Sequence, residues 1–529
     1  MSEARPLRIL FFLLHPGYLR HYRPVIELLA DRGHTLHLAF TAAEKDAGDA
    51  LLVAEVAGEH ERIGTGAAPS RPRADGWRSL AGLSRSLADV SRYAHPRYAE
   101  APTLRARVAR TITEHITSSR TIDPLTRRLS LAVVRFATTR NSPAAARCLG
   151  RVFAEIEAAI PTSRRIDAFI GDFRPDVVLS TPVIEFGSTQ VDYLKSAARL
   201  GIPHAVCVPS WDNLTGKGLI RVRPDRVFVW NDIQRREAIE LHGIAAGRVV
   251  ATGAPKFDEW FVRRPLRTAA EFRKRVGLPA DRQYLLYLCS SPFIAPDEVE
   301  LVTDWLQQLR ADDGLAHLGV LVRPHPQNSR QWAAVDLCRF EAAVIWPRGG
   351  AQPDAGDARA DFFDSLAHSA AVVGINTSAL IESAILGKRV FTVLDPRFAG
   401  TQRGTLHYHY LRAENGGFLH EAGTWDEHLA QLSHAVAVGD DDTGALEFVK
   451  RFVRPHGLDR PASPILADAI EELAAIGTTR APRPPLRSHL VRMLLLPALL
   501  VARLEHVRPR VTKLDLAAPP LQIPPTRRS

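Results

Sequence analysis

Cysteine is scarce in this 529-residue chain, and so is lysine. Cys148, Cys207, Cys289 and Cys338 lie far apart and form neither a CxxC pair nor a cluster with histidine. This spacing argues against a disulfide framework and a structural zinc site, and it favours a reducing cytoplasm. Only eight of the 68 basic residues are lysine, so arginine carries almost all of the net charge of +10.

Long apolar runs are also missing. Residues 9–14 have the length of a strand and lead into His-Pro-Gly instead of a cleavage site, so we expect no signal peptide. The run at residues 489–504 is interrupted by Arg492 and Pro497 and is too short to span a bilayer. We expect there either an interfacial helix flanked by arginines or, equally, a helix that packs on the protein body.

A metal site is not expected. The run Asp440-Asp441-Asp442 is the one acidic cluster that suggests a metal ligand set, but glycine and threonine flank it between two helical patterns. We interpret it as a solvated turn and predict no essential metal.

The first part of the chain alternates strands and helices. A buried strand at residues 7–14 is followed by a helix through Leu29 and a strand at residues 35–40, which is typical of a Rossmann-like half. The alternation resumes near Asp176. We therefore predict an N-terminal Rossmann-like acceptor domain over residues 1–218.

A second series of strands follows. Residues 219–478 are predicted to form a second Rossmann-like domain that binds the donor, and residues 479–529 a Pro/Arg-rich tail with a short apolar helix. Its strands are expected at 227–230, 249–252, 284–288, 319–323, 343–346, 371–374 and 390–394. Two such domains place a cleft between the carboxyl ends of their strands.

Residues 70–165 interrupt the first domain as a helical, strand-poor insertion. Between Arg71 and Arg165 stand eighteen arginines and no lysine, against seven acids. Two explanations of this charge are equally good: the arginines lie on solvated helix faces, or they contact an anionic membrane surface. Nucleic acid is the weaker candidate, because no zinc finger, RNA-recognition aromatic signature or heptad zipper accompanies the arginines.

The segment VVGINTSALIESAILGKRVFTV indicates a buried strand, a polar turn, a short helix and a second strand. Asn376, Thr377 and Ser378 are residue types that cap helices, and the amides of a helix N-terminus beyond a parallel strand can bind a phosphate. Glu382, one turn later, can accept hydrogen bonds from two sugar hydroxyls. The pattern predicts a nucleotide-diphosphate site, although similar segments occur in doubly wound proteins where nothing binds.

Together these features resemble the GT-B superfamily of nucleotide-sugar glycosyltransferases, over roughly residues 7–65 and 170–470. HPGYLRHYRPVIELLADRGH is similar to the first loop and helix of many GT-B enzymes, where a glycine, here Gly17, approaches the acceptor. TGAPKFD is similar to the motif that opens their donor domain, and RPHP to a later part of that domain. The resemblance implies an α/β, GT-B-like fold of two doubly wound domains facing a cleft.

Within the superfamily, the polyol-phosphate (CDP-glycerol-type) transferases that make teichoic-acid-like polymers are a close comparison. Their Trp-His-Gly-Thr…Lys segment corresponds to SWDNLTGKG here, with Trp211 and Lys217 in similar places and Asp212 instead of the histidine. Their Asp-Tyr-Ser-Ser turn is replaced by Asn-Thr-Ser at 376–378. Both departures favour a sugar donor.

Two other signatures of the fold are incomplete. Retaining GT-B enzymes often carry two glutamates eight positions apart, but Gly374 stands eight positions before Glu382. The non-hydrolysing nucleotide-sugar 2-epimerases share the fold, and their catalytic carboxylates find no convincing match in this chain.

Glycosyl transfer without a metal requires amides and cations that neutralise the leaving diphosphate. Lys256, Arg323 and His325 are the predicted donor-binding cations, because each stands at the end of an expected strand. The two prolines of RPHP suit a preorganised site; the less favoured alternative is a proline-rich turn with incidental charge.

The reaction also requires a base for the acceptor hydroxyl. His15, before the first helix, titrates near working pH, and Asp212 is flanked by Asn213 and Lys217, which can orient it. Glu185 is a third and poorer candidate. His15 can instead cap the neighbouring helix, and Asp212 can instead form an Asx-turn.

The leading hypothesis is a cytoplasmic glycosyltransferase that takes a nucleoside-diphosphate sugar as co-substrate, with no further cofactor, at the inner face of the cell membrane. It would build surface polysaccharide on a glycan or lipid-linked acceptor. The alternatives are transfer of a polyol phosphate from a CDP-alcohol and a non-catalytic, membrane-associated carbohydrate-assembly protein. The sequence identifies neither the base and sugar of the donor nor the acceptor.

Overall fold

The computed structural model describes residues 5–44, 47–119, 122–353, 356–439, 443–478 and 486–507. The first sheet contains β1 (Arg8–Leu13), β2 (Thr35–Phe40), β3 (Ile63–Ala67), β4 (Val177–Thr181), β5 (His204–Cys207), β6 (Arg226–Val229) and β7 (Val249–Ala251). The second contains β8 (Tyr284–Leu288), β9 (Gly319–Arg323), β10 (Ala343–Ile345), β11 (Ala371–Gly374), β12 (Val390–Val393) and β13 (Leu419–Ala422).

The helices of the described residues divide into three groups. Those around the first sheet are α1 (Leu19–Asp31), α2 (Ala47–Glu59), α7 (Arg164–Phe173), α8 (Val191–Leu200), α9 (Asn213–Gly216), α10 (Asp232–Glu240) and α18 (Ala462–Ala475). The insertion and tail contain α3 (Trp77–Ser91), α4 (Pro102–Ser118), α5 (Pro124–Thr139), α6 (Pro143–Ala159) and α19 (Leu486–Val507). The remaining helices are α11 (Asp258–Val262), α12 (Ala269–Val276), α13 (Val299–Ala311), α14 (Gly356–Ala367), α15 (Ala379–Ile385), α16 (Trp425–Val438) and α17 (Thr443–Phe452).

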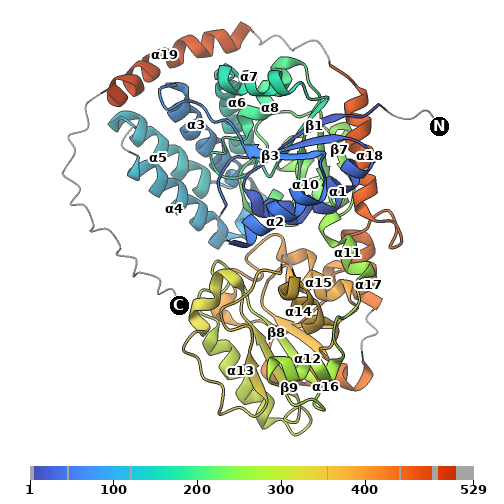
Figure 1. The fold of residues 1–529 in the computed structure, drawn as a ribbon. Coiled ribbons are helices and arrows are strands. Elements are labelled where there is room, and N and C mark those ends of the chain that lie inside the picture. Colours follow the sequence, from blue (N-terminus) through green and yellow to red (C-terminus); the bar gives the residue numbers. More distant parts are fainter. Residues whose placement is uncertain are drawn as a thin grey trace, which may run out of the picture.

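Both sheets are parallel and doubly wound. Their strand orders are β3-β2-β1-β4-β5-β6-β7 and β10-β9-β8-β11-β12-β13, so each order reverses beside its first strand. The two sheets belong to separate lobes, one above the other in Figure 1. The predicted fold class, two Rossmann-like α/β domains, is confirmed.

The sequence of β1 shows why helices cover both faces of the first sheet. Alternate side chains of a strand point to opposite faces. Ile9 and Phe11 join the core that contains α1 and α18, whereas Leu10 and Phe12 join the core that contains α7 and α8. A strand buried on both sides has a continuous apolar sequence, which is what made this element predictable.

Two expected strands of the second series belong to the first sheet. β6 pairs with β5 and β7 pairs with β6, so the chain leaves the first sheet after β7 and not near Gly218 as expected. The residues of a buried strand do not encode which sheet it joins, and this explains the error. β3 and β13, short strands that contain glycine or charged residues, were not predicted.

α18 returns to the first domain, although its residues were expected in the second. Leu466, Ile470 and Leu473 pack into the core formed with α1. The Asp258 carboxylate accepts hydrogen bonds from the first amides of α18, at 2.9 Å from Ala462 N and 2.7 Å from Ser463 N. The TGAPKFD motif therefore anchors the returning helix at the crossover between the domains.

The glycine of that motif is required by the same contact. Gly253 has a positive φ of 90°, and a Cβ added there would lie 2.7 Å from the Cβ of Ala462 at the start of α18.

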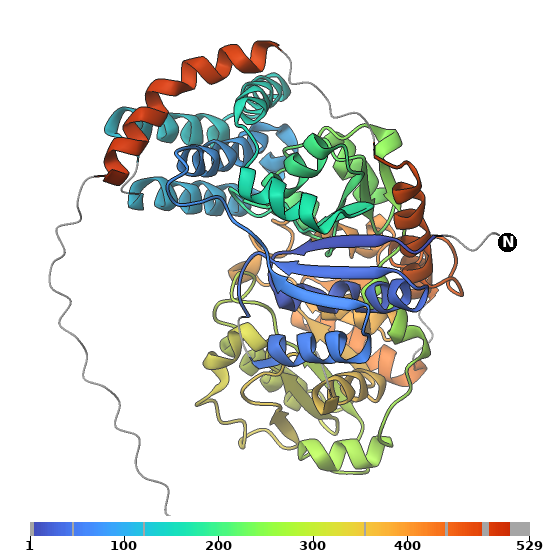
Figure 2. The same ribbon diagram turned by 45° about the horizontal axis from the view of Figure 1, so that its top comes forward.

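The insertion is helical as predicted. α3, α4, α5 and α6 form a helical layer on the first domain, and α19 lies across its outer side against α6 and α3 (Figures 1 and 2). Arg492 Nε donates to the carbonyl of Ala159 at 2.8 Å, so α19 packs on the protein body. Its other side leaves Leu486, Leu490, Met493 and Leu494 exposed.

Among the helices of the described residues, none is long and apolar enough to cross a membrane. The acidic run at 440–442 and the part of the tail beyond residue 507 lie outside the described residues.

The return of α18 yields a stability prediction. Ile470→Ala should reduce the free energy of unfolding by about 2–5 kcal/mol, because it empties a fully buried site between α18 and the first sheet. Ile476→Ala is the matched control, since Ile476 is 50% exposed two turns later and should change stability by less than about 0.5 kcal/mol. Urea unfolding followed by circular dichroism measures both; equal midpoints for the two variants would contradict the docking of α18.

Candidate functional site

A cavity of about 440 Å³ lies between the two domains. The loops after β4 and β5 face those after β8, β9, β11 and β12 across it, at the edge where parallel sheets bind ligands. Seven of the predicted site residues line this cavity: Glu185, Asp212 and Lys217 from the first domain, and His325, Asn376, Thr377 and Ser378 from the second.

One hydrogen bond ties the two domains together at the cavity. Trp211 Nε1 donates to Ser378 Oγ at 3.1 Å, and the indole edge contacts the His407 ring at a centroid distance of 4.8 Å. Ser378 stands at the N-cap of α15, but its side chain makes no capping bond. The expected capping serine instead bridges the domains.

Asp212 is held in place by its neighbours. Its Oδ1 accepts hydrogen bonds from Ser210 Oγ at 2.6 Å and from Asn213 Nδ2 at 3.3 Å. Burial alone would raise the pKa of Asp212, but His407, Lys217 and the Ser210 hydroxyl outweigh it and hold the pKa below its ordinary value. The carboxylate is therefore ionised at neutral pH, and the predicted orienting role of Asn213 agrees with this geometry.

Lys217 forms an ion pair with Glu185. Their Nζ and Oε1 atoms are 2.6 Å apart. Burial opposes the charge of Lys217, but Tyr18, Glu185 and Asp212 outweigh it and raise the lysine pKa. The pair leaves Lys217 cationic at the wall of the cavity and occupies the carboxylate of the third candidate base.

His325 is neutral. It precedes the 3₁₀ helix η6 (Pro326–Trp332), where its Nδ1 accepts a hydrogen bond from Gln327 N at 3.1 Å. Burial lowers its pKa to about 4. A neutral ring with an accepting Nδ1 carries its proton on Nε2, so His325 can donate a hydrogen bond but supplies no charge.

Asn376 fixes the turn after β11. Its Nδ2 donates to the carbonyl of Thr401 at 2.9 Å and to Thr405 Oγ1 at 3.3 Å. The Asn376 amide group is thus occupied by hydrogen bonds to the loop after β12. The hydroxyls of Thr377 and Ser378, which also line the cavity, are the side-chain groups of this turn best placed to contact a ligand.

His15 and Gly17 lie beside the cavity without lining it. His15 Nδ1 is 3.7 Å from Asp49 Oδ2, and the ring packs edge-on against Tyr18. A Cβ at Gly17 would lie 2.6 Å from Asp49 Oδ1. A glycine at this position leaves room for the Asp49 carboxylate of α2. This packing explains the glycine without any contact with an acceptor.

Lys256 and Glu382 form a separate pair. Lys256 Nζ lies 3.7 Å from Glu382 Oε1 and 4.3 Å from the centroid of the Phe257 ring. Burial raises the pKa of Glu382, and Lys256 opposes that effect. Neither side chain lines the cavity, so their predicted contacts with a donor remain a prediction.

Arg323 does not line the cavity either, contrary to expectation. Its guanidinium lies 5.5 Å from the ring centroid of Trp346 and 5.1 Å from that of Phe362, and burial lowers its pKa to about 10. Alternation along β9 explains this position. Arg323 shares the face of Leu321, which packs toward α12 and α14, whereas the loop beyond Pro324 turns His325 to the cavity.

Two ionisable side chains that line the cavity, those of Arg107 and His407, were not predicted. Arg107 of α4 stacks on the Phe293 ring at 3.7 Å, so the insertion supplies a cation to the site. His407 lines it from the loop after β12, where burial lowers its pKa against the effect of Asp212. One arginine among eighteen, and a histidine in an irregular loop, give no signal in a single sequence.

No family model and no curated protein matches the chain. Among solved structures, UDP-GlcNAc 2-epimerase from Methanocaldococcus jannaschii is 12% identical, with a TM-score of 0.45 over 88% of this chain and 99% of that protein. A glycosyltransferase from Rickettsia africae is 10% identical, with a TM-score of 0.45 over 94% and 99%. The glycotransferase of kitacinnamycin is 13% identical, with a TM-score of 0.46 over 89% and 100%.

These similar structures comprise an epimerase and two transferases. The fold assignment rests on the strand order of this chain, and the resemblance to the polyol-phosphate branch stays a prediction.

The state of His325 gives a pH prediction. Between pH 6.5 and about 4 the unfolded chain binds a proton at this residue that the folded protein does not, so the contribution of His325 to stability falls as the pH decreases through that window. A histidine Cε1–H NMR titration, with His325→Gln to identify the resonance, should give a pKa well below the ordinary 6.5. A titration at or above pH 6.5 would contradict the burial.

Proposed function

We propose that this protein is a metal-independent glycosyltransferase that transfers a sugar from a nucleoside-diphosphate sugar to a hydroxyl of a glycan or lipid-linked acceptor. The observation that carries the proposal is the cavity in which Asp212 and Lys217 of one domain face His325, Thr377 and Ser378 of the other. A site divided in this way can hold the donor on one domain and the acceptor on the other.

The donor diphosphate is expected against the second domain. Its negative charge is offset by Lys217 and Arg107, and it accepts hydrogen bonds from His325 Nε2 and from the hydroxyls of Thr377 and Ser378. Three contacts hold these side chains in place: Lys217 pairs with Glu185, Arg107 stacks on Phe293, and Ser378 accepts a hydrogen bond from Trp211. α15 spans only seven residues, so these side chains carry the proposal and not the dipole of that helix.

In the proposed transfer, the acceptor oxygen attacks the anomeric carbon while the bond from that carbon to the diphosphate oxygen breaks. The electron pair of the broken bond leaves with the diphosphate, and the acceptor proton passes to the carboxylate of Asp212. Asp212 suits this role because it is ionised, oriented by Ser210 and Asn213, and lines the cavity. His15 is the second candidate base, and its place outside the lining makes it weaker.

A nucleotide panel tests the donor class. UDP, GDP, CDP, dTDP and ADP are compared by thermal shift, and one base should stabilise the protein by about 2.7 kcal/mol at a hundredfold excess over its Kd. Selective stabilisation by CDP, with hydrolysis of a CDP-alcohol, would instead favour polyol-phosphate transfer. If no nucleotide raises the melting temperature, the non-catalytic alternative replaces the proposal.

Asp212→Asn tests the chemistry separately from binding. The variant should keep the nucleotide response while the rate of sugar transfer falls by about 100- to 10,000-fold, because the amide cannot accept the proton. Asp232→Asn, at an exposed site on α10, is the matched control and should transfer at the wild-type rate. Unchanged transfer by Asp212→Asn would remove that residue from the mechanism.

We propose further that the enzyme works at an anionic membrane surface. Leu486, Leu490 and Leu494 form an exposed apolar stripe on α19, and on α5 the exposed Leu125 and Leu129 stand among arginines. Apolar side chains interspersed with arginine bind at the boundary between lipid headgroups and acyl chains.

Leu490→Glu should weaken binding to vesicles that contain phosphatidylglycerol, because it places a carboxylate on the apolar stripe of α19. Leu266→Glu is the control: both leucines are 64% exposed, but Leu266 lies in the second domain. Flotation assays measure the bound fraction. Wild-type protein that fails to float with anionic vesicles, or equal flotation of the two variants, would exclude this surface.

A further inference from the structure

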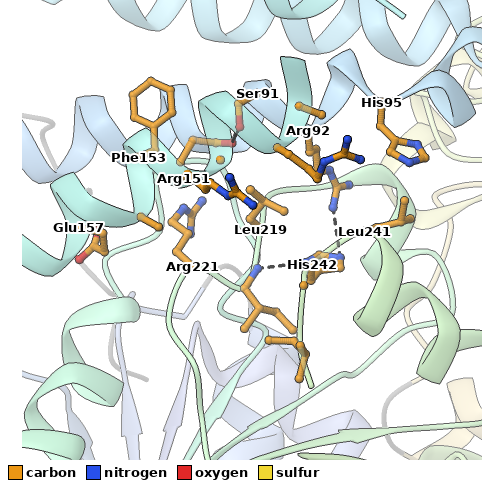
Figure 3. Close-up of a pocket in the computed structure, with 18 of the residues that line it drawn as sticks. Ser91, Arg92, His95, Arg151, Phe153, Glu157, Leu219, Arg221, Leu241 and His242 are labelled. Atoms are coloured by element: carbon orange, nitrogen blue, oxygen red, sulfur yellow. Dashed lines mark hydrogen bonds between the residues drawn. The ribbon is translucent and has the colours of Figure 1, made fainter. Parts of the chain in front are cut away.

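A second cavity lies outside the cleft between the domains. It encloses about 340 Å³ between the helical insertion and two segments of the first domain, residues 219–223 and 240–244 (Figure 3). The ionised side chains of its lining are six arginines and two glutamates: Arg85, Arg92, Arg147, Arg151, Arg221, Arg223, Glu157 and Glu240.

Two of these arginines are neutralised inside the protein. Arg85 pairs with Glu157 and Asp192, each at 2.8 Å. Arg221 pairs with the fully buried Asp89. These pairs brace the insertion against the first domain and add no net charge to the cavity.

Arg92 is a buried cation that forms no direct ion pair among the described residues. It is 5% exposed, and Asp89, the carboxylate that acts on it from farther away, is already paired with Arg221. Its Nη groups donate to three carbonyls, those of Leu214 and Gly218 at 3.2 Å and of Thr215 at 2.8 Å, while its Nε has no hydrogen-bond partner there. Burial opposes this charge, but Tyr98, Tyr93 and Asp89 outweigh burial and raise the pKa of Arg92, so the wall of the cavity carries a positive charge with one N–H left over.

The contact of Arg92 with His242 provides no hydrogen-bond acceptor for the guanidinium (Figure 3). His242 Nδ1 accepts from Ile220 N at 3.1 Å, and its Nε2 lies 2.9 Å from the carbonyl of Leu214. The neutral ring therefore carries its proton on Nε2 and donates to that carbonyl. Arg92 Nη1, 3.2 Å from the same Nε2, thus meets a donor instead of an acceptor.

The mouth of the cavity adds further positive charge. Arg147 and Arg151 are exposed and stand one turn apart on α6, and Arg223 is exposed on the opposite segment. Of the ion pairs formed by described residues, none involves these three side chains, whereas Glu240 lies 3.8 Å from Arg97.

Much of the wall between these arginines is apolar. It includes Ala88, Phe153, Leu219, Ile220, Leu241 and Ile244, beside the polar side chains of Ser84, Ser91, His95, Tyr98 and His242. A ligand that matches the cavity therefore combines an anionic group with an apolar part.

We propose that this cavity binds a phosphate-bearing amphiphile. Its phosphate or diphosphate would lie among Arg92, Arg147 and Arg151, and its apolar part against Phe153 and Leu219. Such a ligand has two sources, a lipid-linked diphosphate or a soluble phosphate compound with an apolar group. The site is distinct from the proposed donor site, which has a different lining.

Calorimetry on the full chain tests the site with farnesyl diphosphate and inorganic diphosphate as probes. Arg147→Glu combined with Arg151→Glu should weaken binding at least tenfold, because it reverses two charges at the mouth without disturbing any buried pair. Arg164→Glu combined with Arg165→Glu is the control, since both arginines are exposed at the start of α7 and line neither cavity. Those changes should leave binding at the wild-type level.

The two probes test the two parts of the ligand. Farnesyl diphosphate binding at least tenfold tighter than inorganic diphosphate supports a lipid-like ligand, whereas equal affinities overturn the amphiphile, because its apolar part would then add nothing. The inference is overturned if neither probe binds wild-type protein, or if the double variant of α6 binds like wild type.

It is also overturned if Lys217→Ala alone abolishes binding, because the probe would then occupy the cleft. The nucleotide panel and Asp212→Asn do not depend on this cavity. If neither probe binds the cavity, the proposed function stands, and if no nucleotide binds the cleft, the proposal for this cavity stands.

Discussion

The segment from Ser210 to Gly218 is the element on which the rest of the site depends. On one side, Trp211 donates to Ser378 and joins the first domain to the second. On the other, the carbonyls of Leu214, Thr215 and Gly218 are held by Arg92. These contacts fix the place of Asp212 and Lys217 in the cavity.

Arg92 thereby connects the two cavities. It lines the arginine-lined cavity, and it bonds to the segment whose Asp212 and Lys217 line the cleft between the domains. The arginines of the insertion were expected to serve as solvated helix faces or as a membrane contact. Two of them have other roles: Arg85 forms buried ion pairs, and Arg107 lines the cleft.

The sequence predicted those parts of the site that follow directly from strand ends. Asp212, His325 and the Asn-Thr-Ser turn at 376–378 lie within five residues after the ends of buried strands, and parallel sheets bring such positions to one edge. It failed where the side chain at a strand end had to be assigned to one face of the sheet. Arg323 is the last residue of β9, and its side chain lies on the face of the sheet that packs against α12 and α14. His325, two residues later, lines the cavity.

Contacts between distant parts of the chain account for the other differences. The membership of β6 and β7 in the first sheet, the return of α18 and the place of Arg107 each depend on partners far along the chain, and no local pattern records them. Gly17 was expected to approach the acceptor; the structure shows its close approach to Asp49, and the contact with an acceptor stays a prediction. The close approach of Gly253 to Ala462 was not predicted.

Hydrogen–deuterium exchange with the stabilising nucleoside diphosphate tests the central claim most directly. If the donor binds between the domains, exchange should slow in peptides that cover residues 210–218 and in those that cover residues 374–382, within the same complex. Protection confined to one domain, or absent from both segments while the nucleotide is bound, would contradict a shared site.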